Sequence, residues 1–133
     1  MAKTIIITGG GEGLGRVLAL RFAADGDRVV LLGRTLAKVQ AVADELGAPH
    51  FAVRCDVSDP ASVREAFAEV ASRCDKVDVL INNAASYDPF TLAEVTEEQV
   101  VGMVNTNLTG PVLCSRAVLP LLKNSGRIIN VSS

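Results

Sequence analysis

The chain has 133 residues, which is enough for one domain at the usual size of about 150 residues. Charged residues make up 21% and hydrophobic residues 49%, the balance of a folded globular protein rather than a disordered one. A formal charge of −2 without basic clusters argues against nucleic acid or an anionic membrane as the main partner, and no apolar run is long enough to span a bilayer.

Short apolar runs alternate with helical patterns in the first part of the chain. Lys3–Thr8 contains three successive isoleucines, which is typical of a strand buried on both faces. Apolar residues then recur at helical spacing from Leu14 until Asp25 and Gly26. The same reading predicts a strand at Arg28–Leu32, a helix at Leu36–Leu46 and a third strand at Phe51–Val53.

The second part of the chain continues this alternation. Asp59 is a suitable cap for a helix that begins at Pro60 and runs to about Ser72. A fourth strand is predicted at Val77–Ile81, followed by an irregular segment at Ser86–Thr96. A largely helical stretch then runs from Glu97 to about Leu122, with a kink or break at Gly110 and Pro111. A fifth strand is predicted at Arg127–Val131. Strands that alternate with helices require right-handed parallel crossovers, so we expect a single α/β domain with a doubly wound parallel sheet.

The glycine-rich segment between the first strand and the first helix carries the strongest local signal. Residues 8–15 read TGGGEGLG. A diphosphate in this position meets unpaired backbone N–H groups and the positive end of the helix dipole, and glycines leave room for it because they lack a Cβ. A tight turn is the structural alternative, but a strand before the segment and a helix after it favour nucleotide binding.

The spacing of the glycines narrows this interpretation. The motif GxGxxG does not fit, because Arg16 stands where its last glycine would be. The motif TGxxxGxG fits through Thr8, Gly9, Gly13 and Gly15, and this pattern resembles the short-chain dehydrogenase/reductase family. Further matches follow in the order that the family has them. Cys55-Asp56-Val57 resembles its Asp-Val pair after the third strand, and Asn82-Asn83-Ala84-Ala85 resembles its NNAG motif with Ala85 in place of the glycine. Asn107-Leu108-Thr109-Gly110 matches its NxxG motif, and Gly126–Ser133 matches the segment that leads to its catalytic serine.

This resemblance covers the whole chain but only the first half of the family. It implies a dinucleotide-binding Rossmann domain over residues 1–133, incomplete relative to the family and truncated after the fifth strand of the order 3-2-1-4-5. It assigns Asn107 to a proton-relay water and Ser133 to orienting the substrate oxygen, although Asn107 taken alone would be read as a kink or cap. The residues implied in binding an NAD(P)(H) cofactor are Thr8, Gly9, Gly11, Gly13, Leu14, Gly15, Arg34, Asp56, Val57, Asn83 and Ala84.

Two charged residues bear on which nicotinamide cofactor fits. NAD recognition usually places a carboxylate about 20 residues after the glycine loop, at the end of the second strand. This chain has Arg34 there, which can pair with a 2′-phosphate and favours NADP(H) over NAD(H). Glu12 argues against NADP(H), because NADP-binding relatives often carry a basic residue at that position. Arg34 could also be a solvated charge at a helix start.

The catalytic pair of the family is missing. In the family a tyrosine acts as general acid/base, and a lysine four residues later lowers its pKa. The only tyrosine here is Tyr87, and Thr91 stands four residues after it. The resemblance therefore implies an NAD(P)-dependent oxidoreductase that interconverts an alcohol and a carbonyl compound. This chain alone is expected not to turn over a substrate, because it lacks the tyrosine and lysine pair. The alternative is a non-catalytic nucleotide-binding or scaffold module, whereas a nucleic-acid-binding domain lacks support because aromatic residues make up only 4%.

The remaining expectations concern compartment and assembly. The amino-terminal residues lead straight into Ile5 without a secretory cleavage site, which favours a cytoplasmic protein. Cys55, Cys74 and Cys114 lack metal or redox spacing, so we expect them to pack as small apolar side chains, and we expect no metal site at the single histidine, His50. The fifth strand is expected at a sheet edge with one apolar face uncovered, which predicts self-association.

Overall fold

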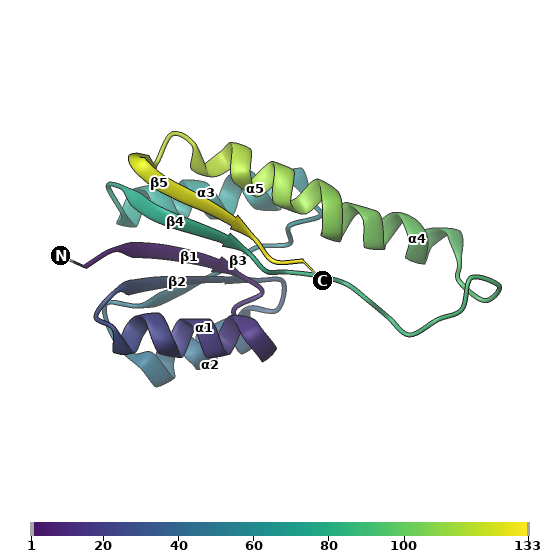
Figure 1. Cartoon of the computed structure of the whole chain (residues 1–133), viewed down its shortest axis with the longest axis horizontal. Coiled ribbons are helices and arrows are strands. Elements are labelled where there is room, and N and C mark those ends of the chain that lie inside the picture. Colours follow the sequence, from purple (N-terminus) through teal and green to yellow (C-terminus); the bar gives the residue numbers. More distant parts are fainter. Residues whose placement is uncertain (1, 133) are drawn as a thin grey trace.

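The computed structural model describes residues 2–132 as a five-stranded parallel sheet with helices on both faces (Figure 1). The strand order is β3-β2-β1-β4-β5, so the predicted doubly wound sheet of the Rossmann type is confirmed. The elements are β1 (Thr4–Thr8), α1 (Gly13–Ala24), β2 (Arg28–Gly33), α2 (Leu36–Leu46), β3 (Phe51–Arg54), α3 (Pro60–Arg73), β4 (Val77–Asn82), α4 (Glu97–Val104), η1 (Asn105–Thr109), α5 (Gly110–Val118) and β5 (Leu122–Asn130).

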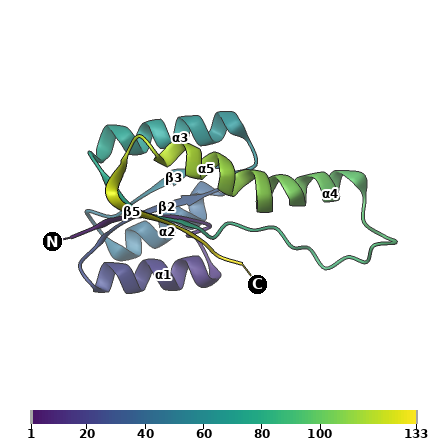
Figure 2. The ribbon, with the colours of Figure 1, turned by 45° about the horizontal axis from the view of Figure 1, so that its top comes forward.

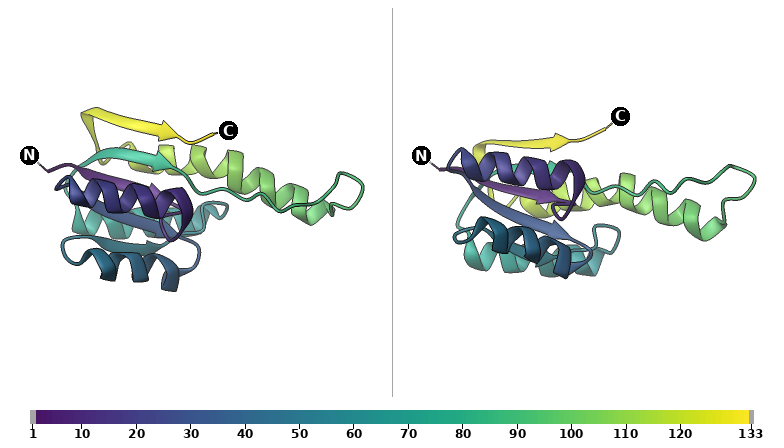
Figure 3. Two further views of the ribbon diagram at one scale, coloured as in Figure 1. Left: turned by 60° about the horizontal axis from the view of Figure 1, so that its bottom comes forward. Right: turned by 90° about the horizontal axis from the view of Figure 1, so that it is seen from below.

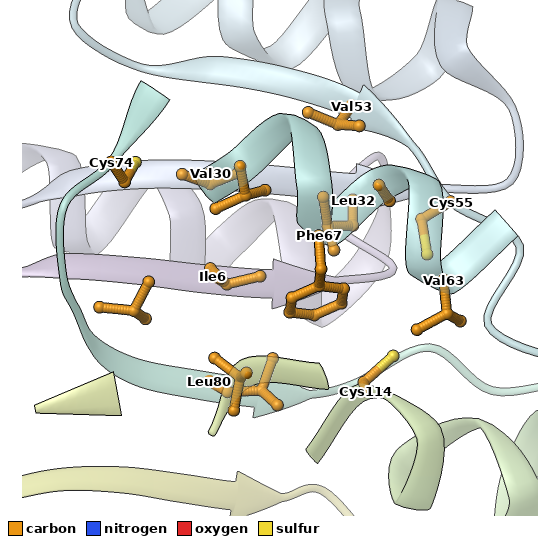
Figure 4. Close-up of a cluster of buried hydrophobic side chains, with 14 of the residues drawn as sticks. Ile6, Val30, Leu32, Val53, Cys55, Val63, Phe67, Cys74, Leu80 and Cys114 are labelled. Atoms are coloured by element: carbon orange, nitrogen blue, oxygen red, sulfur yellow. The ribbon is translucent and has the colours of Figure 1, made fainter. Parts of the chain in front are cut away.

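Alternation of side chains along the central strand builds two apolar layers. Helices α1 and α2 cover one face of the sheet, and α3 and α5 cover the other (Figure 2). Ile5 and Ile7 belong to the core cluster on the side of α1 and α2, whereas Ile6 belongs to the cluster on the side of α3 and α5. Ile6 lies in one cluster with Leu32 and Phe67 (Figure 4). The run of isoleucines is continuous because both faces of β1 are buried, as in other parallel sheets.

The prediction that the three cysteines pack in the core is confirmed. Cys55, Cys74 and Cys114 are free and buried, and all belong to the cluster around Ile6 (Figure 4). The hydrogen bond to Cys55 and burial raise the pKa of the Cys114 thiol, so this residue stays a neutral packing group.

The helical stretch after the irregular segment is interrupted by a single wide turn. The predicted interruption at Gly110 and Pro111 lies one turn later than the observed one, since Asn105–Thr109 form the π-helical turn η1 and α5 starts at Gly110. Pro111 has no N–H for the carbonyl of Asn107, and its ring would crowd that carbonyl, so the preceding turn widens. Among residues 2–132, no helix has the length and apolar character needed to cross a membrane.

The last predicted boundaries need correction. The helix ends at Val118 and not near Leu122, because Pro120 has no N–H to donate to the helix. Leu119 keeps helical geometry, but the N–H groups of Leu121 and Leu122 donate to the carbonyl oxygens of Val118 and Leu119, so the chain leaves the helix in tight turns. The strand β5 begins at Leu122 and not at Arg127. Its register slips early, since Val77 pairs with Leu122 but Val79 already pairs with Arg127. The residues between them bulge out of the ladder.

Strand β5 lies at the edge of the sheet, where α1 and α2 do not reach (Figure 3). Ile129 pairs in register with Ile81, yet Ile129 is 44% exposed while Ile81 is 3% exposed. Val131, just beyond the strand, is 42% exposed. The apolar face of the sheet therefore continues into solvent at β5.

Candidate functional site

A cleft of about 780 Å³ opens at the carboxyl ends of the strands. Parallel α/β sheets bind ligands at this edge, where the loops after the strands meet. The loops after β1, β2, β3 and β4 all contribute, as do Val131 and Ser132 after β5. The predicted cofactor-binding residues that line this cleft are Gly9, Gly11, Gly13, Leu14, Arg34, Asp56, Val57, Asn83 and Ala84.

The glycine loop leaves the start of α1 open to the cleft. Gly13 begins the helix with a φ of +56°, and a Cβ added there would meet no atom within 4 Å. Glu12 occupies the N-cap position, but its side chain makes no capping hydrogen bond. The first N–H groups of α1 therefore have neither an intrahelical partner nor a side-chain cap, which is the arrangement that binds anions at helix N-termini.

Two predicted cofactor-binding residues, Thr8 and Gly15, lie beneath the loop and do not line the cleft. Thr8 is 1% exposed, and its Oγ1 accepts the N–H groups of Asn83 and Ala84, each at 3.0 Å. A Cβ at Gly15 would collide with the carbonyl oxygen of Gly9, so the helix can approach the loop only with glycine there. Both residues hold the glycine loop against the end of β4.

Charged groups gather where the loop after β2 meets the glycine loop. Arg34, Thr35 and Lys38 line this part of the cleft. Lys38 Nζ lies 3.5 Å from both carboxylate oxygens of Glu12. Within residues 2–132, the guanidinium of Arg34 forms no ion pair, so it is free to receive an anionic group.

The end of β3 is ordered by a small hydrogen-bond network around Asp56. Its Oδ1 accepts the N–H of Ser58 at 3.0 Å and the Ser58 hydroxyl at 2.7 Å. Its own N–H donates to Ser62 Oγ at 2.9 Å. From the sequence Ser58 is recognisable only as a turn residue and Ser62 is not singled out, although turn serines next to an Asp are a recognised signal of such local bonds.

The two asparagines at the end of β4 connect different parts of the site. Asn83 Nδ2 donates to the carbonyl oxygen of Gly9 at 3.2 Å and so holds the glycine loop. The neighbouring Asn82 is buried and donates from Nδ2 to Ser115 Oγ at 3.1 Å and Asn130 Oδ1 at 2.9 Å. Asn82 therefore joins β4 to α5 and β5.

Asn107 lies in the π-helical turn and holds the loop that follows β4. Its Nδ2 donates to the Ser86 carbonyl oxygen and its Oδ1 accepts the Ser86 N–H, both at 2.7 Å. Tyr87, next to Ser86, lines the cleft and is 84% exposed. Ser133, the other residue predicted to be catalytic, lies outside the described residues.

The sequence model of a family described as short chain dehydrogenase matches residues 3–133. The chain is similar to sorbitol dehydrogenase of Cereibacter sphaeroides, with 34% identity over 134 residues covering 98% of this chain and 52% of that protein. It is also similar to meso-2,3-butanediol dehydrogenase of Serratia marcescens, with 37% identity covering 98% of this chain and 53% of that protein. The chain thus spans about half the length of the curated relatives it matches.

Solved structures agree with these relatives. A 3-ketoacyl-(acyl-carrier-protein) reductase from Brucella melitensis complexed with NADH superposes with a TM-score of 0.91 at 34% identity, covering 98% of this chain and 57% of that one. A blue fluorescent protein from a metagenomic library in complex with NADPH gives a TM-score of 0.89 at 33% identity, covering 98% of this chain and 56% of that one. The match over residues 3–133, together with this shared architecture, shows that the chain belongs to the short-chain dehydrogenase family.

Proposed function

We propose that residues 1–133 form the NAD(P)(H)-binding portion of an oxidoreductase that interconverts an alcohol and a carbonyl compound. The observation that carries this proposal is the uncapped start of α1, which faces the cleft beside the open space at Gly13. A cofactor diphosphate is the kind of anion that such a helix start binds. Relatives solved with NADPH and NADH support the choice of ligand.

Each part of the cleft has a binding role in this proposal. The N–H groups of Gly13 and Leu14 would hold the diphosphate, while Val57 and the fixed loop at Asp56 would contact the adenine. Asn83 would support the glycine loop from below. The nicotinamide ring of the bound cofactor supplies or accepts the hydride of the reaction.

Arg34 supports a preference for NADP(H). It lines the cleft at the end of β2, where a carboxylate would be expected for NAD(H), and a guanidinium can pair with a 2′-phosphate through two parallel hydrogen bonds. In Arg34→Gln, we expect NADPH affinity to fall by about tenfold, while NADH affinity stays within about twofold. Isothermal titration calorimetry of both dinucleotides measures the two changes.

Arg54→Gln is the matched control for this substitution. Arg54 pairs in register with Gly33 at the end of the neighbouring strand, is exposed and does not line the cleft. The Arg54→Gln variant should leave the affinities for NADH and NADPH unchanged. Equal losses of NADH and NADPH binding in Arg34→Gln would contradict the assignment of Arg34 to a 2′-phosphate.

The residues of this chain hold the substrate side of the site without supplying its acid/base pair. Asn107 would position the loop at Ser86 through its two hydrogen bonds, and Ser133 would orient the substrate oxygen. Tyr87 is exposed in the loop after β4, and Thr91 stands four residues later, where the family has its lysine. The 133-residue chain would therefore bind the cofactor without turning over a substrate.

We also propose that this chain self-associates through the uncovered face and open edge of β5. Ile129 continues the buried apolar face of the sheet into solvent, and β5 pairs with a strand on one side only. We expect light scattering to show dimers or larger species at micromolar concentrations. Ile129→Lys should shift the sample to monomer, because a charge on this face opposes its burial.

Leu92→Lys is the control for this effect. Leu92 is 92% exposed in the irregular segment, which projects away from the sheet (Figure 1). The Leu92→Lys variant should leave the mass distribution measured by light scattering unchanged. A wild-type chain that stays monomeric over a wide concentration range would refute self-association.

A further inference from the structure

The residue just before β3 is the only histidine of the chain, and its ring extends the sheet. Val30 pairs in register with Phe51, so the next rung towards the start of the two strands would join Val29 to His50. A side chain forms this rung, because the N–H of Val29 donates to His50 Nδ1 at 3.0 Å. The ring of His50 thus takes the place of a backbone carbonyl oxygen at the start of β3.

The amide of Val29 depends on this contact. The preceding amide, that of Arg28, donates to the Lys3 carbonyl oxygen at 2.8 Å on the side of β1. Successive amides of a strand point to opposite sides, so the amide of Val29 points towards β3. Val29 is buried, and a buried N–H without an acceptor is costly. The His50 ring therefore fastens the start of β3 to β2.

Only one form of the ring can accept this hydrogen bond. Nδ1 must carry no proton, so the neutral ring has its proton on Nε2. In the imidazolium both ring nitrogens are donors, and the Nδ1 proton would then face the N–H of Val29. Burial of the ring also lowers the pKa of His50 from its ordinary value of 6.5. Protonation of His50 therefore opposes the contact with Val29.

Charged groups approach the ring from three elements. A hollow of about 320 Å³ beside His50 is lined by Asp44 from α2 and Arg73 from α3. On β2, Arg28 lies beside the Cys74 thiol. The carboxylate favours an imidazolium and the guanidinium groups disfavour it, so these charges act against one another. Burial and the hydrogen bond from Val29 are then the main controls on protonation of the ring.

We propose that His50 is a pH-sensitive latch, which fastens the start of the edge strand β3 to β2 when the ring is neutral and releases it when the ring is protonated. Strand β3 lies at the edge of the sheet, so its first residues can separate while the other strands stay paired. The carboxyl end of the pair stays joined, because the Cys55 N–H donates to the Gly33 carbonyl oxygen at 2.9 Å. The latch therefore acts at the end of the strands opposite the cleft and does not depend on the proposed cofactor site.

The latch should make the stability of the chain depend on pH just below neutrality. His50 in the unfolded chain binds a proton with its ordinary pKa, whereas the folded chain binds it only at lower pH. The stabilisation is therefore complete above about pH 6.5 and is lost as the pH falls through the pKa of the folded chain. Urea unfolding should show an equilibrium constant for unfolding that rises about fivefold from pH 7.5 to 5.5.

His50→Asn is the matched variant. Its amide oxygen can accept the Val29 N–H from nearly the same place as Nδ1 and does not titrate. We expect the equilibrium constant of this variant to change by less than about twofold over the same pH range. His50→Phe keeps a ring without the acceptor, so it should be less stable than the wild type at pH 7.5 and equally insensitive to pH. If both variants keep the pH dependence of the wild type, other groups cause it and the inference is overturned.

Nuclear magnetic resonance of the wild-type chain tests the latch without a substitution. At pH 7.5 the ring nitrogens should show the proton on Nε2, and the His50 signals should titrate below pH 6.5. As the ring titrates, the Val29 amide should lose protection from hydrogen exchange, while the Arg28 amide, which donates to a backbone carbonyl oxygen, should keep its protection. A neutral ring with its proton on Nδ1, or an equal loss of protection at both amides, would overturn the inference.

Discussion

Replacing Gly13 by aspartate should abolish binding of both NADH and NADPH. An added Cβ at this position meets no protein atom within 4 Å, so the new side chain would enter the open space at the start of α1. Its carboxylate would accept the free N–H groups and repel a diphosphate. We expect both affinities to fall by at least about a hundredfold, measured by calorimetry.

Gly26→Asp separates this effect from backbone strain. Gly26 also has a positive φ, +90°, and open space around its Cβ position, but it lies in the turn between α1 and β2. Both variants place a non-glycine residue in the left-handed region, at a cost of about 1–2 kcal/mol each. Only Gly13→Asp should lose binding. Full binding by a folded Gly13→Asp chain would refute the placement of the diphosphate.

Replacing Thr8 by valine should lower the free energy of unfolding by about 2–4 kcal/mol. The two side chains have nearly the same shape, so packing at this buried position is retained. The hydroxyl oxygen that accepts the N–H groups of Asn83 and Ala84 is lost, which leaves two donors without their partner. Urea unfolding followed by circular dichroism measures the loss.

Thr8→Ser keeps the hydroxyl and removes only the methyl group, so it should lower the free energy of unfolding by about 1 kcal/mol. Comparison of the two variants isolates the hydrogen bonds from the packing. If serine and valine destabilise the chain equally, the hydroxyl of Thr8 does not join β1 to β4.

Much of the fold follows from local patterns in the sequence. The isoleucines of β1, the cap at Asp59 and the glycines after β1 each specify their own element, and order along the chain restricts the sheet to few topologies. The position of Arg34 at the end of β2 follows from the same pattern, so it could be predicted at the cleft before the structure was known.

Contacts between distant residues could not be predicted in the same way. Glu12 and Lys38 are 26 residues apart, and their ion pair depends on how closely Gly11 packs against α2. The amide of Asn107 reaches Ser86 across 21 residues from a π-helical turn that periodicity does not reveal. The start of β5 was missed because its first residues bulge out of the ladder and lack alternation.

The central position of β1 determines which part of the molecule can move. Hydrogen-bonded strands flank it on both sides and buried layers cover both its faces, so the backbone amides of Ile5–Ile7 should exchange with deuterated solvent only when the whole domain opens. The loops that line the cleft are held at fewer points, such as the hydrogen bond from the Gly10 N–H to the Leu32 carbonyl oxygen, so their amides should exchange sooner. The proposed dinucleotide would then enter and leave by movement of these loops, while the sheet beneath them stays rigid.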